Sequence, residues 1–119
     1  MTKVTFITTA AQGDLLLRKI DAMPVQVKEL APIDGVFVIA HSETGHNHVI
    51  DSAPNVKWYS GDDAMISYLE VVDASDATET LLRHLRGHDT HKTIVVPVGV
   101  FELRRQREYT PQGWRRVED

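Results

Sequence analysis

The sequence predicts an all-β (β-rich) protein: a small barrel or sandwich of short, mostly antiparallel strands, with at most one short helix. Most apolar segments are brief and rich in Val, Ile, Thr, Phe and Tyr, the residue types enriched in strands. Gly, Pro, Asp or Asn separates these segments at short intervals, which is typical of the turns between strands. With 119 residues, 42% of them apolar, the chain is long enough for a single β domain, 1–119, with its own core.

Five strands are expected in the first half of the chain. They span 3–8, 15–20, 25–30, 36–40 and 46–50. The strand at 36–40 follows the turn signal Pro32 to Gly35, in which Pro presets one dihedral angle and Gly supplies a positive φ. A short loop containing Gly45 separates 36–40 from 46–50, so these two strands predict a hairpin.

The second half contains four further expected strands and one ambiguous segment. The strands span 56–59, 66–72, 93–96 and 100–109, with turns at Gly61 to Asp63 and at Pro97 to Gly99. The segment from Asp76 to Arg86 fits a helix, because its leucines share a helical spacing. One more short strand fits the same residues, and both interpretations remain open.

Composition excludes several classes of protein. The chain has no cysteine, which removes disulfide frameworks, thiolate zinc fingers, iron–sulfur ligation and cysteine nucleophiles. The net charge of -4 gives no global attraction to nucleic acid or to an anionic membrane. Met1 to Ala11 is too polar and too short for a signal peptide, so we expect a cytoplasmic protein without a membrane partner. No glycine-rich phosphate loop is present, so no nucleotide cofactor is expected.

The histidines are the main chemical signal. All six lie in two segments: His41, His46 and His48 in the first, and His84, His88 and His91 in the second. On an extended strand, histidines two residues apart point to one side with β-carbons about 6–7 Å apart, near enough to share an ion.

We therefore expect a divalent metal, Zn, Fe, Mn or Ni, held by His46, His48, His88 and His91, with His41 as a possible further ligand. Glu43 and Glu102 are the candidate catalytic bases if the ion keeps an open coordination position. Strand register decides whether the two segments meet. The alternative is hydrogen-bonded surface or interface histidines, which change charge at mildly acidic pH.

The C-terminal segment combines arginines with aromatic residues. Arg104, Arg107 and Tyr109 are its main candidates, followed by Trp114. This composition suits phosphate or single-stranded nucleic acid. Acidic residues such as Glu102 and Glu108 interrupt it, so Arg–Glu pairs between neighbouring strands or subunits are the favoured interpretation, and nucleic acid is the less favoured partner.

Two motifs resemble those of a small uncharacterised bacterial family that is also met in phage-related contexts. The first is Thr44-Gly45-His46-Asn47-His48-Val49-Ile50, and the second runs from Arg104 to Tyr109 as R-x-Q-R-E-Y. The resemblance covers the chain from about Gly13 onward. It places His46, His48, His88 and His91 in the family's motifs and implies no established activity.

The order of the histidine pair and the Pro97 to Gly99 turn also resembles the two cupin motifs. In this sequence Asp51 is the only acid shortly after the pair, where cupins carry a glutamate, and Glu102 occupies the position of the second-motif histidine. The likeness is a fold-level analogy and supplies no function by itself.

Three functions follow as hypotheses. The first is a divalent-metal-binding β protein, whose status as an enzyme and whose small-molecule substrate stay open. The second is a non-enzymatic homo-oligomeric structural or assembly component, of phage origin, because short β proteins with exposed strand edges tend to pair between chains. The third is a nucleic-acid accessory protein that uses the C-terminal arginines and aromatic residues.

Overall fold

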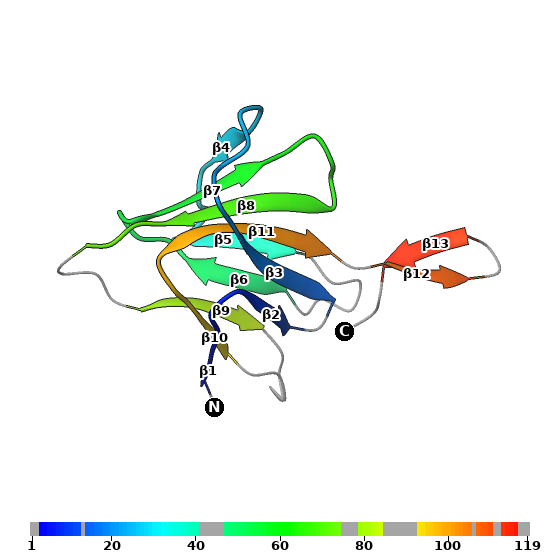
Figure 1. The fold of residues 1–119 in the computed structure, drawn as a ribbon, viewed down its shortest axis with the longest axis horizontal. Coiled ribbons are helices and arrows are strands. Elements are labelled where there is room, and N and C mark those ends of the chain that lie inside the picture. Colours follow the sequence, from blue (N-terminus) through cyan, green and yellow to red (C-terminus); the bar gives the residue numbers. More distant parts are fainter. Residues whose placement is uncertain are drawn as a thin grey trace.

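The computed structural model describes residues 3–12, 14–40, 47–74, 79–84, 93–105, 107–110 and 113–116, and of 84, 107–110 and 113–116 the backbone alone. Within these ranges the chain forms thirteen strands and no helix. Two sheets pack face to face as a sandwich, and a hairpin extends from one end of it (Figure 1). The predicted all-β class with mostly antiparallel strands is confirmed.

The first sheet has five strands. Their order is β1 (Lys3–Thr5), β10 (Thr93–Val96), β9 (Thr80–His84), β6 (His48–Asp51) and β5 (Val36–Ala40). β1 and β10 pair in parallel, and the other neighbours in this sheet are antiparallel.

The second sheet has six strands, all paired antiparallel. Their order is β2 (Thr9–Gln12), β3 (Leu15–Ile20), β11 (Gly99–Arg105), β8 (Ile66–Val71), β7 (Val56–Ser60) and β4 (Lys28–Leu30). β12 (Arg107–Thr110) and β13 (Gly113–Arg116) form the separate hairpin. Each sheet ends at open edge strands, so the barrel alternative is wrong and the sandwich is correct.

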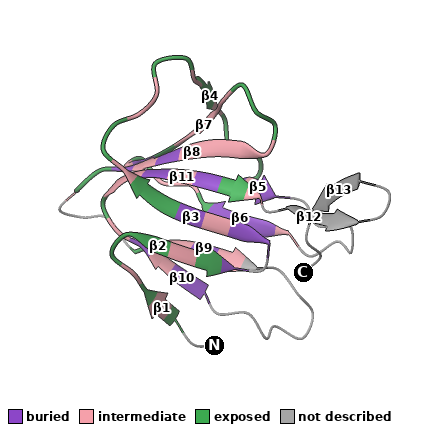
Figure 2. Ribbon diagram, turned by 45° about the vertical axis from the view of Figure 1, so that its right-hand side comes forward, coloured by how far each residue is buried: buried purple, intermediate pink, exposed green. Residues whose placement is uncertain are grey.

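Alternating burial along the strands builds the core between the sheets. In β11, Phe101 and Leu103 are buried while Glu102 between them faces outward, as a two-residue period requires. Phe37 of the first sheet meets Trp58 of the second edge to face, with ring centroids 5.8 Å apart. Figure 2 shows the buried segments concentrated in β6, β10 and parts of β3, β8 and β11, whereas β1 is largely exposed. Each fully buried large apolar side chain contributes about 1.5–3 kcal/mol to folding.

The structure corrects several element boundaries. The helix hypothesis for Asp76 to Arg86 is wrong over 80–84, because these residues form β9 between two neighbouring strands and bury Leu82. The strand at 9–12 was not predicted, and the expected strand at 25–30 is shortened to 28–30. The expected strand at 100–109 is divided into β11 and β12, and the 36–40 and 46–50 hairpin is confirmed with its second strand described from His48.

The turn at Pro32 to Gly35 has a tighter form than predicted. Ile33 and Val36 exchange two backbone hydrogen bonds of 2.8 and 3.1 Å. Both central residues have positive φ, 51° at Asp34 and 80° at Gly35. An Asp-Gly pair with two positive φ angles is the preferred two-residue connection of a β-hairpin.

The topology gathers several strand ends at one end of the sandwich. In the first sheet Ala40, His48 and His84 stand opposite one another on three adjacent strands. In the second sheet Leu15 stands opposite Arg105. We call this region, defined by these five residues, the histidine end.

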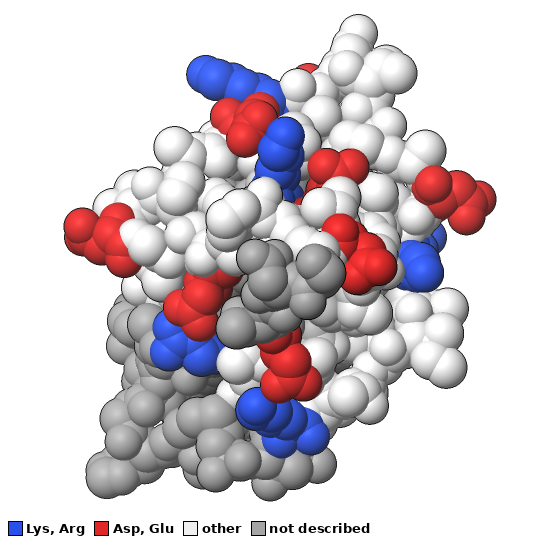
Figure 3. Space-filling model, turned by 90° about the vertical axis from the view of Figure 1, so that its left-hand side faces the viewer, with Lys and Arg blue, Asp and Glu red and all other residues white. Residues whose placement is uncertain are grey.

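Charged side chains of both signs are scattered over the face shown in Figure 3. They lie among a larger area of other residues, and several acidic residues lie beside a basic one. Among the described residues there is also no helix with the length and hydropathy needed to cross a membrane.

Candidate functional site

Among the polar residues that the structure describes, His48 has the lowest exposed fraction. It begins β6 and shares a face with Ile50, whose side chain belongs to the core. Its exposed fraction is 0%, equal to that of Ile50. The imidazole therefore points across the sandwich toward the second sheet, where an imidazole requires hydrogen-bonding partners.

Gln12 provides the first partner, and its orientation is determined. The amide Nε2 of Gln12 donates to the carbonyl oxygen of Leu82 on β9 over 3.1 Å. Its Oε1 therefore faces Nδ1 of His48, 2.9 Å away. Because an amide oxygen only accepts, Nδ1 must carry the proton and donate.

Asp14 provides the second partner. Its Oδ1 lies 3.2 Å from Nε2 of His48, and the two side chains are 4% and 0% exposed. With the Nδ1 proton already assigned, a neutral His48 would turn the Nε2 lone pair toward a carboxylate oxygen. Two lone pairs repel at this distance, so a proton or a metal cation must lie between these two atoms.

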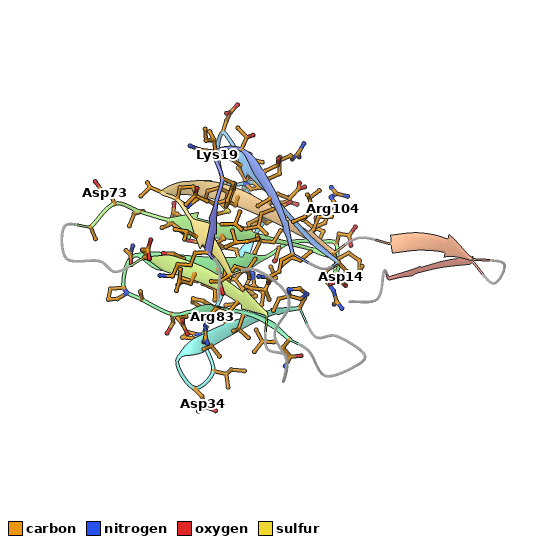
Figure 4. All side chains as sticks on the ribbon, turned by 90° about the horizontal axis from the view of Figure 1, so that it is seen from below. Asp14, Lys19, Asp34, Asp73, Arg83 and Arg104 are labelled. Atoms are coloured by element: carbon orange, nitrogen blue, oxygen red, sulfur yellow. The ribbon has the colours of Figure 1, made fainter. Side chains whose placement is uncertain are left out.

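The separation of the two atoms lies at the long end of the range for a hydrogen bond and close to the spacing of two ligands on one metal ion. A charge-assisted N–H···O bond is usually about 2.7–2.9 Å long, shorter than the 3.2 Å observed. Two neighbouring ligands held at about 2.0–2.1 Å from a tetrahedral ion lie about 3.3 Å apart. Figure 4 shows Asp14 at the end of the molecule from which the β12–β13 hairpin extends, whereas Asp73 lies at the opposite end.

Of the histidines predicted as ligands, the structure describes His48 alone. His41, His46, His88 and His91, as well as Glu43, lie outside the described residues. The strands that flank the two histidine segments are neighbours, because β6 pairs with β9 and His48 stands opposite His84. The register thus places His48 and His84, the strand residues next to the two histidine segments, at the histidine end.

Gln12 and Asp14 were not predicted as site residues. In the sequence Asp14 follows Gly13 between two short strands, where an acid is most often a solvated turn residue. Its burial depends on the packing of the second sheet against His48, a long-range contact without a local signature. Among the residues described, His, Asp and Glu form no cluster of three or more that could hold an ion.

Glu102 lies away from this pair. It occupies the outer face of β11, opposite Arg18 of β3, and its side chain is 13% exposed. Its carboxylate accepts from Arg18 and from Arg104, each over 3.3 Å. The structure therefore places this candidate base in an Arg–Glu–Arg ladder and does not bring it together with His48.

The other arginine candidates are divided between the sandwich and the hairpin. Arg104 is exposed on the outer face of β11. Arg107 and Tyr109 belong to β12, where Arg107 stands opposite Arg116 and Tyr109 opposite Trp114 in β13. The register thus pairs the two aromatic positions of the hairpin.

Comparison with known proteins gives one result. A family model described as a domain of unknown function (DUF8820) matches residues 11–106. No curated protein and no solved structure matches the chain. The matched range contains Gln12, Asp14 and His48, and it agrees with the expected membership of an uncharacterised family.

Proposed function

The chain belongs to the DUF8820 family, a domain of unknown function, and we propose that it binds a divalent metal ion at the histidine end through Nε2 of His48 and Oδ1 of Asp14. The observation that carries the proposal is the meeting of these two atoms at 3.2 Å while Nδ1 of His48 donates its proton in a hydrogen bond to Oε1 of Gln12. Metal-bound histidines commonly donate their second N–H to an oxygen acceptor, which orients the ring and raises its basicity.

The remaining ligands come from the two histidine segments. His46 lies two residues before His48, and His88 and His91 follow β9, the strand that pairs with β6. His41 follows β5, the other neighbour of β6. A donor set of imidazoles with one carboxylate suits Zn, Fe, Mn or Ni and disfavours Ca or Mg, which prefer oxygen ligands.

An ion with an open coordination position would polarise a substrate oxygen or activate a water molecule. In that case Glu43 is the candidate base from the first histidine segment. Gln12 would keep the His48 ring in position during such chemistry, because its own amide is held by the carbonyl of Leu82.

The test is the metal content of untagged protein, measured by inductively coupled plasma mass spectrometry after purification and again after dialysis against each metal. We expect near-stoichiometric zinc, iron, manganese or nickel. Asp14→Asn and His48→Gln should lose it, because each removes one ligand atom while the side chain keeps nearly its size. Asp51→Asn is the matched control, since Asp51 is exposed and pairs with Arg83.

Circular dichroism of each variant shows whether it folds, so loss of metal from a folded Asp14→Asn protein supports the proposal. Wild-type protein that is metal-free and takes up no metal on dialysis would overturn it. The proton would then be the particle between His48 and Asp14, and the pair would be a buried structural link.

A second candidate function is that of a non-enzymatic homo-oligomeric structural or assembly component of phage origin. The open edges of both sheets favour it, because β1, β5, β2 and β4 each present one side without a neighbouring strand in the described sheets. Light scattering coupled to size exclusion would show a stable oligomer at micromolar concentration if this candidate is correct, and a monomer if it is wrong.

A further inference from the structure

One face of the hairpin formed by β12 and β13 combines arginine with aromatic positions. Successive residues of a strand alternate between its two faces, and residues directly opposite each other in an antiparallel pair share a face. Arg107 stands opposite Arg116, and Tyr109 stands opposite Trp114. The register therefore places these four positions together. We call this the arginine–aromatic face, defined by Arg107, Tyr109, Trp114 and Arg116.

The acidic residues that interrupt the basic segment in the sequence do not belong to this face. Glu108 lies on the other face of the hairpin, where it stands opposite Arg115. An opposite-charge pair in directly opposite positions is stabilising. Glu102 belongs to β11 of the sandwich, where its carboxylate accepts from Arg18 and Arg104. The fold thus separates the arginine–aromatic face from both acids.

The arginine–aromatic face has two unfavourable features. Like charges directly opposite each other on neighbouring strands are destabilising, and Arg107 and Arg116 occupy such positions. A two-stranded hairpin with no further strand or helix against it is marginally stable at best in water. Within the described ranges β12 and β13 pair only with each other, and Figure 1 shows the hairpin extending away from the sandwich. A negatively charged partner on this face would offset the repulsion and supply the missing contacts.

The aromatic positions indicate which class of anionic partner fits. Tyr109 and Trp114 occupy one level of the hairpin, and the arginine pair follows two residues along, at a distance of about 6–7 Å. Bases stack on aromatic side chains, and arginine binds phosphate. A single strand of nucleic acid presents both groups side by side, whereas an acidic peptide has no base to stack. The net charge of -4 disfavours a broad anionic surface such as a membrane.

We propose that the arginine–aromatic face binds single-stranded nucleic acid. Bases would stack on Tyr109 and Trp114, and phosphates would bind Arg107 and Arg116. Because stacking on aromatic rings tolerates every base, the binding is expected to be independent of sequence. The proposal goes beyond metal binding and does not require the ion, since β12 and β13 form a sheet separate from the strands that hold His48 and Gln12.

The probes are fluorescein-labelled oligothymidine and oligouridine of about twelve nucleotides, within the usual site size of such proteins. Fluorescence anisotropy with the full chain, in the presence of a chelator, gives the affinity for each and shows whether DNA or RNA is preferred. Two bound phosphates predict a slope of about -1.4 when the logarithm of the binding constant is plotted against that of the salt concentration. A duplex of the same length should bind more weakly, because its bases are already stacked.

Two adjacent arginines provide the matched comparison. Arg116→Gln removes a charge from the arginine–aromatic face, so it should weaken both oligonucleotides at least about fivefold and reduce the salt slope by about 0.7. Arg115→Gln makes the same change in charge on the other face, opposite Glu108, and should weaken binding by less than about twofold. A diffuse attraction to the positively charged hairpin would instead affect both variants equally.

Variants of Trp114 test the stacking. Trp114→Ala should weaken the oligonucleotides at least about tenfold, whereas Trp114→Phe keeps an aromatic ring and should retain most of the affinity. Oligothymidine should quench the tryptophan fluorescence of the wild type but not that of Trp114→Phe, because the remaining tryptophan, Trp58, belongs to β7 of the sandwich. Circular dichroism shows whether each variant keeps the fold.

Several results would overturn the inference. They are the absence of saturable binding, equal losses in Arg115→Gln and Arg116→Gln, unchanged affinity in Trp114→Ala, and a duplex bound as tightly as the single strands. Binding to phosphatidylserine vesicles or to polyglutamate in place of the oligonucleotides would assign the face to a membrane or to an acidic protein. Binding that appears only after metal is restored would place the nucleic acid at the ion, so this proposal would fail while the metal proposal stands.

Discussion

Gln12 of the six-stranded sheet holds His48 of the five-stranded sheet through a 2.9 Å hydrogen bond at Nδ1. The other end of the same amide donates to the carbonyl of Leu82, the residue opposite Ile50 in the register. One side chain thus joins two strands of the opposite sheet and determines which nitrogen of His48 carries a proton. Gln12 is for this reason a positioning residue for the proposed metal ligand.

Replacing Gln12 with leucine tests whether Gln12 positions His48, because leucine fills similar space but makes neither hydrogen bond. Gln12→Leu leaves the Nδ1 proton of His48 and the Leu82 carbonyl without their partner, so we expect a loss of about 2 kcal/mol in the free energy of unfolding. Metal affinity should fall about 10–100-fold, as it does when a partner of a metal-bound histidine is removed. Urea denaturation and competition with a metal-binding dye measure the two effects.

Gln12→Glu tests the same hydrogen bond conservatively. The carboxylate keeps the acceptor for Nδ1 but loses the donor to Leu82, so the stability loss should persist while metal affinity recovers at least in part. Gln26→Ala, at an exposed position, should change unfolding by less than about 0.5 kcal/mol. Equal metal affinity in Gln12→Leu and wild type would show that Gln12 does not position His48.

The turn before β5 gives a clean test of backbone strain. Gly35 has φ of 80°, and a Cβ added there meets no atom within 4 Å. Gly35→Ala should therefore destabilise the protein by about 1–2 kcal/mol through the positive φ alone. Asp34→Gly, at φ 51°, should be neutral or slightly stabilising, and thermal unfolding of both variants compares the two positions. A neutral Gly35→Ala would mean that the turn rearranges at little cost.

The sequence predicts those features of the fold that depend on local residue patterns. The β class, the turn at Asp34-Gly35 and the hairpin of β5 and β6 depend on residue types and short spacings, and the structure contains them all. The segment 80–84 was ambiguous because Leu81 and Leu82 fit a helical face as well as a strand. Residues 80–84 form a strand because they pair with β10 and β6. Both of these strands lie outside the segment whose residue pattern was ambiguous.

The candidate site was found only in part for the same reason. His48 was predicted as a metal ligand from its spacing to His46, a local pattern. Gln12 and Asp14 lie 36 and 34 residues away from His48 in the chain and meet it only because the two sheets pack face to face. Glu102 has a carboxylate that could act as a base. In β11, however, side chains alternate between the two faces, so Glu102 faces outward while Leu103 faces the core.

Glu102 should accordingly behave as a surface ladder residue. Glu102→Gln leaves Arg18 and Arg104 facing each other across a neutral amide, so unfolding should become easier by no more than about 1 kcal/mol. The effect should shrink at 1 M salt, where charges are screened within about 3 Å. Metal content should equal that of the wild type. Loss of metal from this variant would place Glu102 in the site and contradict the position described above.

A double-mutant cycle measures how His48 and Asp14 depend on each other. In the presence of a chelator, His48→Leu removes the imidazole that faces the Asp14 carboxylate, whose side chain is 4% exposed, and we expect a loss of about 3–5 kcal/mol in the free energy of unfolding. His48→Leu combined with Asp14→Leu removes both charges, so its cost should be about 1–3 kcal/mol smaller than the sum of the single variants. Urea denaturation at several wavelengths provides the values, and additive costs would show that the two side chains are not coupled.

Metal should stabilise the folded wild type and leave the Asp14→Asn protein unaffected. An ion that binds only the folded chain stabilises it by about 2.7 kcal/mol at one hundred times its dissociation constant. For a domain of this size, that corresponds to a rise of roughly 10 °C in the midpoint of thermal unfolding.

Asp14→Asn retains the packing between the sheets but removes the negative oxygen opposite Nε2 of His48, so its midpoint should not move when metal is added. Differential scanning calorimetry with each of the four metals gives the comparison. An equal rise in both proteins would place the ion elsewhere on the chain, because the buried pair would then contribute no ligand.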